Sequence, residues 1–163
     1  MDDLFSDARL TLAGLLFEAH EGFVAKLEPV IRRSGLSTLD LNALMRLSRS
    51  PGRRLRMSDL ATQTSLSTSG VTRLVDRLAA AGLVERDACA EDRRTTFAVL
   101  TAAGAERLEQ VLPAYLDAVE RWFTGLLTPE QLEALAAGLR ILRDAARPEA
   151  TAGTQVSAPQ PHK

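Results

Sequence analysis

The chain has 163 residues and a net charge of −1, and 45% of its residues are hydrophobic but only 4% aromatic. This length and composition predict one compact domain, with or without an appendage, and a Leu-, Val- and Ala-rich core that favours helices. One cysteine excludes an internal disulfide, and no apolar run is long enough to cross a membrane. The acidic start, MDD, lacks the basic region of a secretory signal, so we expect a cytoplasmic protein with no membrane partner.

The charges are unevenly distributed along the chain. Residues 46–94 contain ten arginines and six acidic residues, whereas the rest of the chain contains ten basic and fifteen acidic residues. A basic middle segment between acidic ends is typical of a DNA-contacting module on a neutral scaffold. An ordinary solvated surface is the alternative.

Two helices are predicted at the start of the chain. Apolar residues recur at helical spacing over 6–33, where Pro29 is expected to kink or interrupt the helix and Ser34-Gly35 to end it. A second helix is predicted over 38–49, before the breaking sequence SPG at 50–52.

A short helix and an amphipathic helix are predicted next. The short helix follows Met57, with Ser58 as its N-cap, and Ser65 and Ser67 mark a turn. Gly82 lies where the amphipathic helix is expected to end. Its apolar stripe is Val71, Leu74, Val75 and Leu78.

The pattern then changes to that of a β-hairpin. Residues 84–86 are compatible with a strand, and residues 95–100 are β-branched and apolar. The charged segment 87–94 between them predicts a polar hairpin tip.

Two further helices are predicted after the hairpin. Thr101 caps one over 102–126, where Pro113 indicates a bend. The sequence TPEQ at 128–131 is a capping box with proline at the first helical position, and it opens a helix that ends near residue 146. The segment 147–163 has no apolar period after Pro148 and is predicted to be a disordered tail.

The short helix, the turn and the amphipathic helix have the order of a helix-turn-helix motif. In that motif the second helix buries one face and presents polar groups and arginines to the major groove. Hydroxyls at its start let backbone N–H groups approach a phosphate, and the arginines suit base edges or phosphates. The candidate DNA-binding residues of this helix are Ser67, Thr68, Ser69, Thr72, Arg73 and Arg77. An ordinary surface helix is the alternative.

Runs in the hairpin region resemble the signature of the MarR (multiple antibiotic resistance regulator) family. They are LVER at 83–86, DRR at 92–94 and AVLTAAG at 98–104. Ala98 stands where the family pattern D-x-R-x-x-x-V-x-L-T-x-x-G has Val. The run SGVTRLVDRL at 69–78 also resembles the family's recognition helix, and a looser similarity extends over 8–146. The matched positions of the pattern are Asp92, Arg94, Leu100, Thr101 and Gly104.

The resemblance implies roles for the charged residues of the wing, which is the predicted hairpin. Arg94 would reach into the minor groove of DNA from the wing tip, with Asp92 orienting it by an ion pair. A narrow A·T-rich minor groove attracts an inserted arginine; from the residues alone, a solvated turn pair is the alternative. Arg86 and Arg93 are expected to contact phosphates. Upstream, three arginines either touch the DNA backbone or lie in a solvated loop: Arg53, Arg54 and Arg56.

The resemblance also implies a homodimer, because the first and the last two helices interleave in this family. It predicts a mainly α fold with a small β-hairpin wing: a winged helix-turn-helix domain at 38–101 and a helical dimerisation region at 6–37 and 102–146. A two-fold dimer places its recognition helices one DNA turn, about 34 Å, apart, so the expected partner is double-stranded DNA with a pseudo-palindromic operator.

A small aromatic or amphipathic effector is implied as well, bound between the dimer helices and the DNA-binding lobe. A purely structural role in the core is the alternative for each candidate residue of this cleft. The candidates are Phe17, His20, Phe23, Met45 and Met57.

Other classes of function find less support in the sequence. There is no Cys/His cluster with zinc spacing, no glycine-rich phosphate loop and no credible catalytic set, so we expect no enzyme activity, no metal site and no cofactor. Nearby arginines would favour the thiolate of Cys89, but redox sensing is the weaker hypothesis for this lone thiol. The leading hypothesis is a ligand-responsive transcriptional repressor. The alternatives are an activator of the same fold and a winged-helix protein–protein interaction module, which would present an acidic or apolar recognition face.

Overall fold

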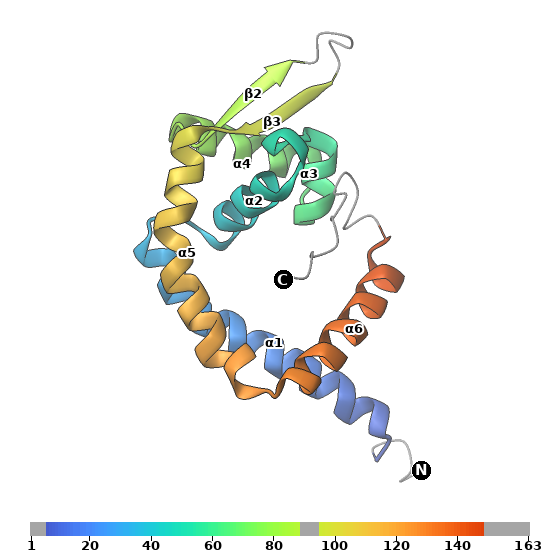
Figure 1. Ribbon diagram of the computed structural model, residues 1–163. Helices are drawn as coiled ribbons and strands as arrows, with labels where there is room; N and C mark the ends of the chain where they lie inside the picture. The colour runs from blue at the N-terminus through green and yellow to red at the C-terminus, as the bar shows by residue number, and fades with distance from the viewer. Residues whose placement is uncertain (1–5, 89–94, 149–163) are drawn as a thin grey trace, which may run out of the picture.

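The computed structural model describes residues 6–88 and 95–148, in a mainly helical fold with one small sheet (Figure 1). The predicted fold class is confirmed. Its elements are α1 (Ala8–Arg33), α2 (Thr38–Arg49), η1 (Pro51–Arg53), β1 (Arg54–Arg56), α3 (Met57–Thr64), α4 (Thr68–Ala80), β2 (Val84–Ala88), β3 (Thr96–Leu100), α5 (Ala102–Trp122), η2 (Thr124–Leu126) and α6 (Pro129–Ala146).

The three strands form an antiparallel sheet in the order β1-β3-β2. Strands β2 and β3 are the predicted hairpin, with Val84 opposite Leu100. Strand β1 was not predicted; it pairs with β3 and places Leu55, only 3% exposed, opposite Ala98 in the core. Arg54 and Arg56 therefore lie in an edge strand rather than in a loop. Three residues are too short for an alternation that a sequence pattern could reveal.

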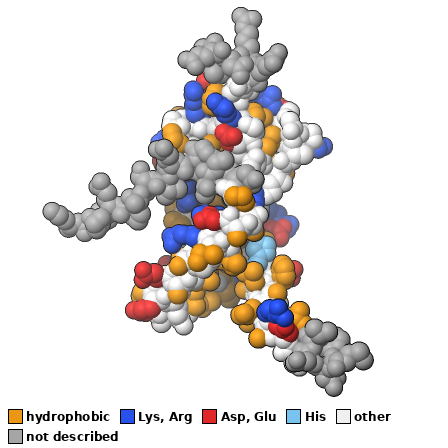
Figure 2. Space-filling model, turned by 90° about the vertical axis from the view of Figure 1, so that its right-hand side faces the viewer, with side chains coloured by type: hydrophobic (Ala, Val, Ile, Leu, Met, Phe, Trp, Pro, Cys, Tyr) orange, Lys and Arg blue, Asp and Glu red, His pale blue; other side chains and the backbone are white. Residues whose placement is uncertain are grey.

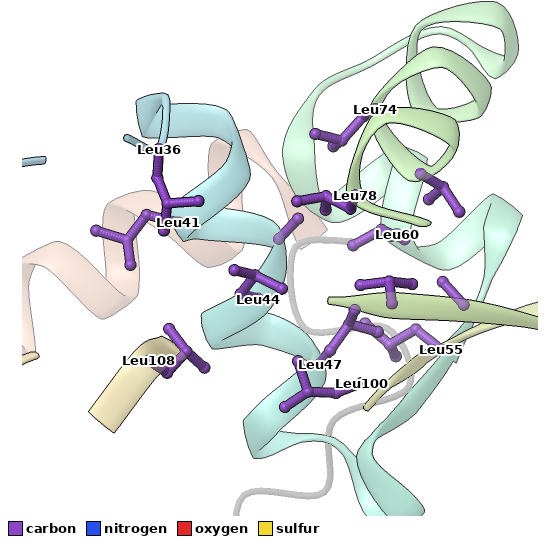
Figure 3. Close-up of a cluster of buried hydrophobic side chains, with 14 of the residues drawn as sticks. Leu36, Leu41, Leu44, Leu47, Leu55, Leu60, Leu74, Leu78, Leu100 and Leu108 are labelled. Atoms are coloured by element: carbon purple, nitrogen blue, oxygen red, sulfur yellow. The ribbon is translucent and has the colours of Figure 1, made fainter. Parts of the chain in front are cut away.

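The core lies between the helix-turn-helix and the sheet. Leucines of α2, α3, α4 and the strands converge on one space in Figure 3, and most of them are almost completely buried. The buried face of α4 consists of the predicted stripe, Val71, Leu74, Val75 and Leu78. This packing leaves the opposite face of α4 exposed.

A close backbone approach fixes the start of α5. Thr101 caps the helix by accepting a hydrogen bond from Gly104 N, and its hydroxyl donates to Gly82 O at 2.7 Å. A Cβ atom on Gly104 would lie 2.1 Å from the carbonyl oxygen of Leu83. The Thr101–Gly104 part of the signature therefore holds α5 against the end of the helix-turn-helix.

Several predicted helix ends differ from the structure. Helix α3 begins at Met57 and not after Ser58, because the extended backbone of β1 continues to Arg56, which is the N-cap residue and makes no side-chain cap. The fifth helix ends at Trp122 rather than at residue 126. A Cβ on Gly125 would lie 2.7 Å from Glu120 O, so the chain folds back closely on the helix end.

The two helical prolines do not end their helices. Helix α1 continues through Pro29 to Arg33, and α5 continues through Pro113. The capping box at Thr128 and Gln131 is confirmed at the start of α6. Of the predicted tail, only residues 147 and 148 are described.

Helices α1 and α5 extend away from the winged part of the molecule, and α6 turns back toward it from the far end of α5 (Figure 1). Hydrophobic side chains gather over the lower half of the face in Figure 2, where these helices lie. Among the large hydrophobic side chains of the described residues, the largest exposed fractions belong to Ile141 of α6, at 71%, and to Leu12 of α1 and Leu126 of η2, at 68%. None of the helices within residues 6–88 and 95–148 is long and apolar enough to span a membrane.

Candidate DNA-binding surface

The exposed first turn of α4 presents hydroxyl groups at the helix N-terminus. Ser67 is the N-cap and accepts a hydrogen bond from Gly70 N at 3.1 Å, and its hydroxyl lies 3.1 Å from that of Ser69. Thr68 is exposed beside them. The N-terminal ends of helix dipoles and hydroxyl groups favour anions, so this turn suits a phosphate.

Arg73 and Thr72 follow one turn later on the polar face of α4. The Arg73 guanidinium is exposed, and its Nε donates to the carbonyl oxygen of Ser69 at 3.3 Å. The Thr72 hydroxyl donates to Thr68 O at 2.8 Å. Both contacts are within the helix, so DNA could replace them without disturbing tertiary packing.

Arg86 connects the wing to α4. Its Nη2 lies 2.8 Å from Asp76 Oδ1 and 3.4 Å from the carbonyl oxygen of Thr72. The side chain of Arg86 nevertheless stays exposed enough to meet a phosphate. The wing and the recognition helix therefore share a cation at their junction.

A groove of about 340 Å³, the wing groove, lies between α3, α4 and the sheet. Its polar lining includes two arginines, on β1 and β2, and hydroxyls from α3, α4 and β3. The groove is lined by Arg56, Met57, Ser58, Ala61, Thr68, Val71, Thr72, Arg86, Thr95 and Thr96. Arginines and hydroxyl groups bind phosphates, so this lining suits a sugar–phosphate backbone.

Arg77, also predicted to contact DNA, makes an ion pair with Asp40 of α2. Its Nη2 lies 2.6 Å and its Nε 3.1 Å from Asp40 Oδ1. Burial raises the pKa of Asp40, but hydrogen bonds from Ser37 and Arg77 outweigh it and hold that pKa below its ordinary value. Asp40 was not singled out from the sequence, although the spacing of Ser37 and Asp40 is that of a capping box.

The wing-tip residues Asp92, Arg93 and Arg94 lie outside the described residues, as does Cys89. Their roles stay predictions. Beside the described part of the wing, Arg54 of β1 stacks over the Phe97 ring at 4.1 Å from its centroid and lies 3.5 Å from Asp87.

A second cleft, of about 210 Å³, lies between α1, α2 and α5. It brings together His20, Phe23 and Met45, three of the five predicted effector contacts, and adds Tyr115, whose pKa is raised by burial. Phe17 is exposed on α1 outside this lining, and Met57 lies in the wing groove instead. In the described residues no group of three or more His, Cys, Asp or Glu side chains could hold a metal ion.

A helix-turn-helix followed by a β-hairpin that packs on its second helix defines the winged helix-turn-helix class of proteins. A family model described as "MarR family" matches residues 34–95. The chain is 32% identical over 104 residues to the transcriptional repressor YetL of Bacillus subtilis; this alignment covers 64% of the chain and 62% of YetL, slightly under two thirds of that relative.

Two solved structures from Streptomyces coelicolor are similar over almost their whole length. AbsC, a MarR family transcriptional regulator, shares 37% identity with a TM-score of 0.80, over 87% of this chain and 96% of AbsC. Sco3205, a MarR family regulator solved in complex with DNA, shares 33% identity with a TM-score of 0.78, over 86% of this chain and 91% of Sco3205. The chain belongs to the MarR family of transcriptional regulators.

Proposed function

We propose that the protein is a sequence-specific DNA-binding repressor that places α4 in the major groove and the wing in the adjacent minor groove. The observation that carries this proposal is the shared face of Ser67, Ser69, Arg73 and Arg86, in which hydroxyls and arginines surround the start of α4. A protein–protein interaction module would instead present an apolar or acidic face. Asp76 is the one described acidic side chain of α4, and Arg86 pairs with it.

We infer that the functional unit is a homodimer, with residues 6–37 and 102–146 as the dimerisation region and 38–101 as the DNA-binding domain. Leu10, Leu12, Leu16 and Phe17 of α1 are exposed, and so are Ile141 and Leu142 of α6. An extended apolar surface on a single chain indicates an interface. A two-fold dimer would read a pseudo-palindromic operator with half-sites about 34 Å apart.

We propose that the cleft around His20, Phe23, Met45 and Tyr115 binds a small aromatic or amphipathic effector. It lies where α1 and α5 meet α2, so a ligand there would contact both the proposed dimerisation helices and α2 of the DNA-binding domain. An effector would lower DNA affinity only if it favoured a protomer arrangement that does not match the half-site spacing. Activation of transcription by the same DNA-binding mode is the alternative to repression.

Selection of duplexes from a randomised pool by the purified protein tests DNA binding. The expected result is an enriched inverted repeat, bound with an affinity that falls steeply as salt rises, because arginine contacts release counterions from DNA. Enrichment of a single unrepeated half-site would contradict the dimer. Absence of any enriched sequence would contradict the proposed function.

A reporter gene placed behind the enriched duplex separates repression from activation. Expression of the protein should lower the reporter signal. An increase would favour the activator alternative while leaving the DNA-binding mode intact.

A further inference from the structure

The carboxylate of Asp40 receives hydrogen bonds from two different parts of the chain. Its Oδ2 accepts from Ser37 N at 2.9 Å and from the Ser37 hydroxyl at 2.7 Å, within the capping box of α2. Its Oδ1 accepts from Nε and Nη2 of Arg77 on α4. The Oδ2 atom therefore fixes the start of α2, and the Oδ1 atom fixes α4 to the start of α2.

The two partners differ in their exposure to solvent. Asp40 is buried, with 6% of its surface exposed, whereas 55% of the Arg77 side chain is exposed. A buried carboxylate that loses its cation keeps an uncompensated charge, and that loss is costly. Moving Arg77 onto a DNA phosphate would leave the buried charge of Asp40 without its cation, so the ion pair favours keeping Arg77 at Asp40.

Arg77 differs in this respect from Arg73 and Arg86, the other arginines in the described parts of α4 and the hairpin. Arg73 bonds only a carbonyl oxygen of its own helix. Arg86 bonds an exposed carboxylate, that of Asp76, whose side chain is 60% exposed. Only the Arg77 pair, among these three, joins α4 to a buried group of another helix.

We infer that Asp40 is a positioning residue for DNA recognition: through its ion pair with Arg77 it fixes the second half of α4 against the start of α2, and Arg77 is not itself a DNA contact. The leucine packing between α2 and α4 is not directional. The ion pair is directional, and it fixes the rotation of α4 about its axis, which aims Arg73 and Thr72. This inference rests on the proposed docking of α4 in DNA.

Four variants test the inference with the duplex that the wild-type protein enriches. Asp40→Asn removes the charge at nearly constant volume, and Arg77→Gln removes the cation and shortens the side chain; the double variant removes both. Asp40→Glu keeps the charge and an acidic residue suited to the capping box. Leu36→Val, a buried change at the α1–α2 turn outside the pair, serves as a stability-matched control.

The expected results separate positioning from contact. Asp40→Asn and Arg77→Gln should each weaken binding about tenfold, with no further loss in the double variant, because contacting residues are not additive. The slope of log affinity against log salt should stay unchanged, and Asp40→Glu should recover part of the loss. Hydrogen exchange without DNA should speed up in the second half of α4 in Asp40→Asn and stay unchanged in α6.

Other outcomes would overturn the inference. Arg77 would be a phosphate contact if Arg77→Gln reduced the slope of log affinity against log salt by about one and Asp40→Asn bound the duplex as tightly as the wild type or more tightly. Additive losses of affinity, unchanged hydrogen exchange in α4, or an equal loss of affinity in Leu36→Val would also overturn the inference. If the wild-type protein enriches no duplex at all, both the proposed function and this inference fail. If the wild-type protein binds its duplex and Asp40→Asn binds it with the same affinity, only this inference fails.

Discussion

The guanidinium of Arg86 on β2 lies 2.8 Å from the carboxylate of Asp76 on α4, so the wing is tied to the recognition helix by one exposed ion pair. Arg86 also donates to the backbone of α4 at Thr72 O. An exposed pair of this kind contributes little to folding stability, commonly under about 1 kcal/mol. Its larger effect is on the charge that the surface presents to DNA.

Replacing Asp76 with Asn should raise affinity for non-specific duplexes several-fold at low salt, because a negative charge disappears and Arg86 becomes available to phosphates. Arg86→Ala should lower affinity for all duplexes and reduce the salt slope by about one. Fluorescence anisotropy over a salt series measures both. Glu85→Gln is the matched control, since Glu85 is the neighbouring exposed carboxylate on the same strand and precedes Arg86 on the opposite face of the sheet. Equal gains of affinity in Asp76→Asn and Glu85→Gln would show that the change of net charge alone causes the effect.

Arg73→Ala should relax sequence preference rather than weaken binding uniformly. Arg73 is exposed on α4 and has only an intrahelical bond to give up, so it is the best placed side chain for a base edge. Loss of one such contact costs about 1–3 kcal/mol at the preferred base and little at other bases. Competition among duplexes changed at single positions measures this. Arg32→Ala on α1 should change nothing, and an equal loss on every duplex would make Arg73 a phosphate contact.

Gly104→Ala should destabilise the fold by roughly 3 kcal/mol, because the added Cβ would meet the backbone of Leu83 and the Leu100 side chain, and backbone cannot move aside cheaply. Urea unfolding measures the loss. Gly22→Ala adds the same methyl group to α1, where a Cβ would meet nothing within 4 Å, and should stabilise by about 1 kcal/mol through helix propensity. Similar stabilities for the two variants would contradict the close approach at Gly104.

Acid should remove the contribution of Asp40 to stability. Its pKa is lowered in the folded state, so the contribution is fully present above the ordinary value of 3.8 and is lost as the pH falls below 3.8 through the folded pKa. The free energy of unfolding of the wild type should therefore exceed that of Asp40→Asn by a constant amount near neutral pH. Below pH 3.8 the two curves should converge. Urea unfolding at a series of pH values measures the difference, and a gap that persists in acid would contradict the role of the Asp40 charge.

Ile141→Asp should separate the expected dimer into monomers, because it places a charge among exposed apolar side chains of α6. Burying such a side chain contributes about 1.5–3 kcal/mol, so loss of two per dimer should weaken association by at least a hundredfold. Sedimentation velocity measures the change. Ile141→Val keeps the surface apolar and should stay dimeric. A wild-type protein that sediments as a monomer would contradict the dimer itself.

The sequence by itself determined the order of the elements and the family. The apolar stripe of α4, the β-branched run of β3 and the capping box of α6 are local patterns whose physical basis is the period of a helix or strand and the hydrogen-bonding of its first turn. The signature residues Thr101 and Gly104 could also be identified in advance. What they do, capping α5 and permitting its contact with Leu83, appeared only in three dimensions.

Only the tertiary structure decided which partners the charged residues have. Arg73 and Arg77 lie one turn apart on α4 and look equivalent in the sequence, but Asp40, 37 positions before Arg77, lies beside one of them and not the other. The strand β1 and the true start of α3 were likewise decided by pairing with β3, a contact distant in sequence. A local pattern indicates which face of an element is polar. Which buried group that face contacts depends on how the elements pack. Packing brings together residues that are far apart in the sequence, and no periodic pattern predicts such contacts.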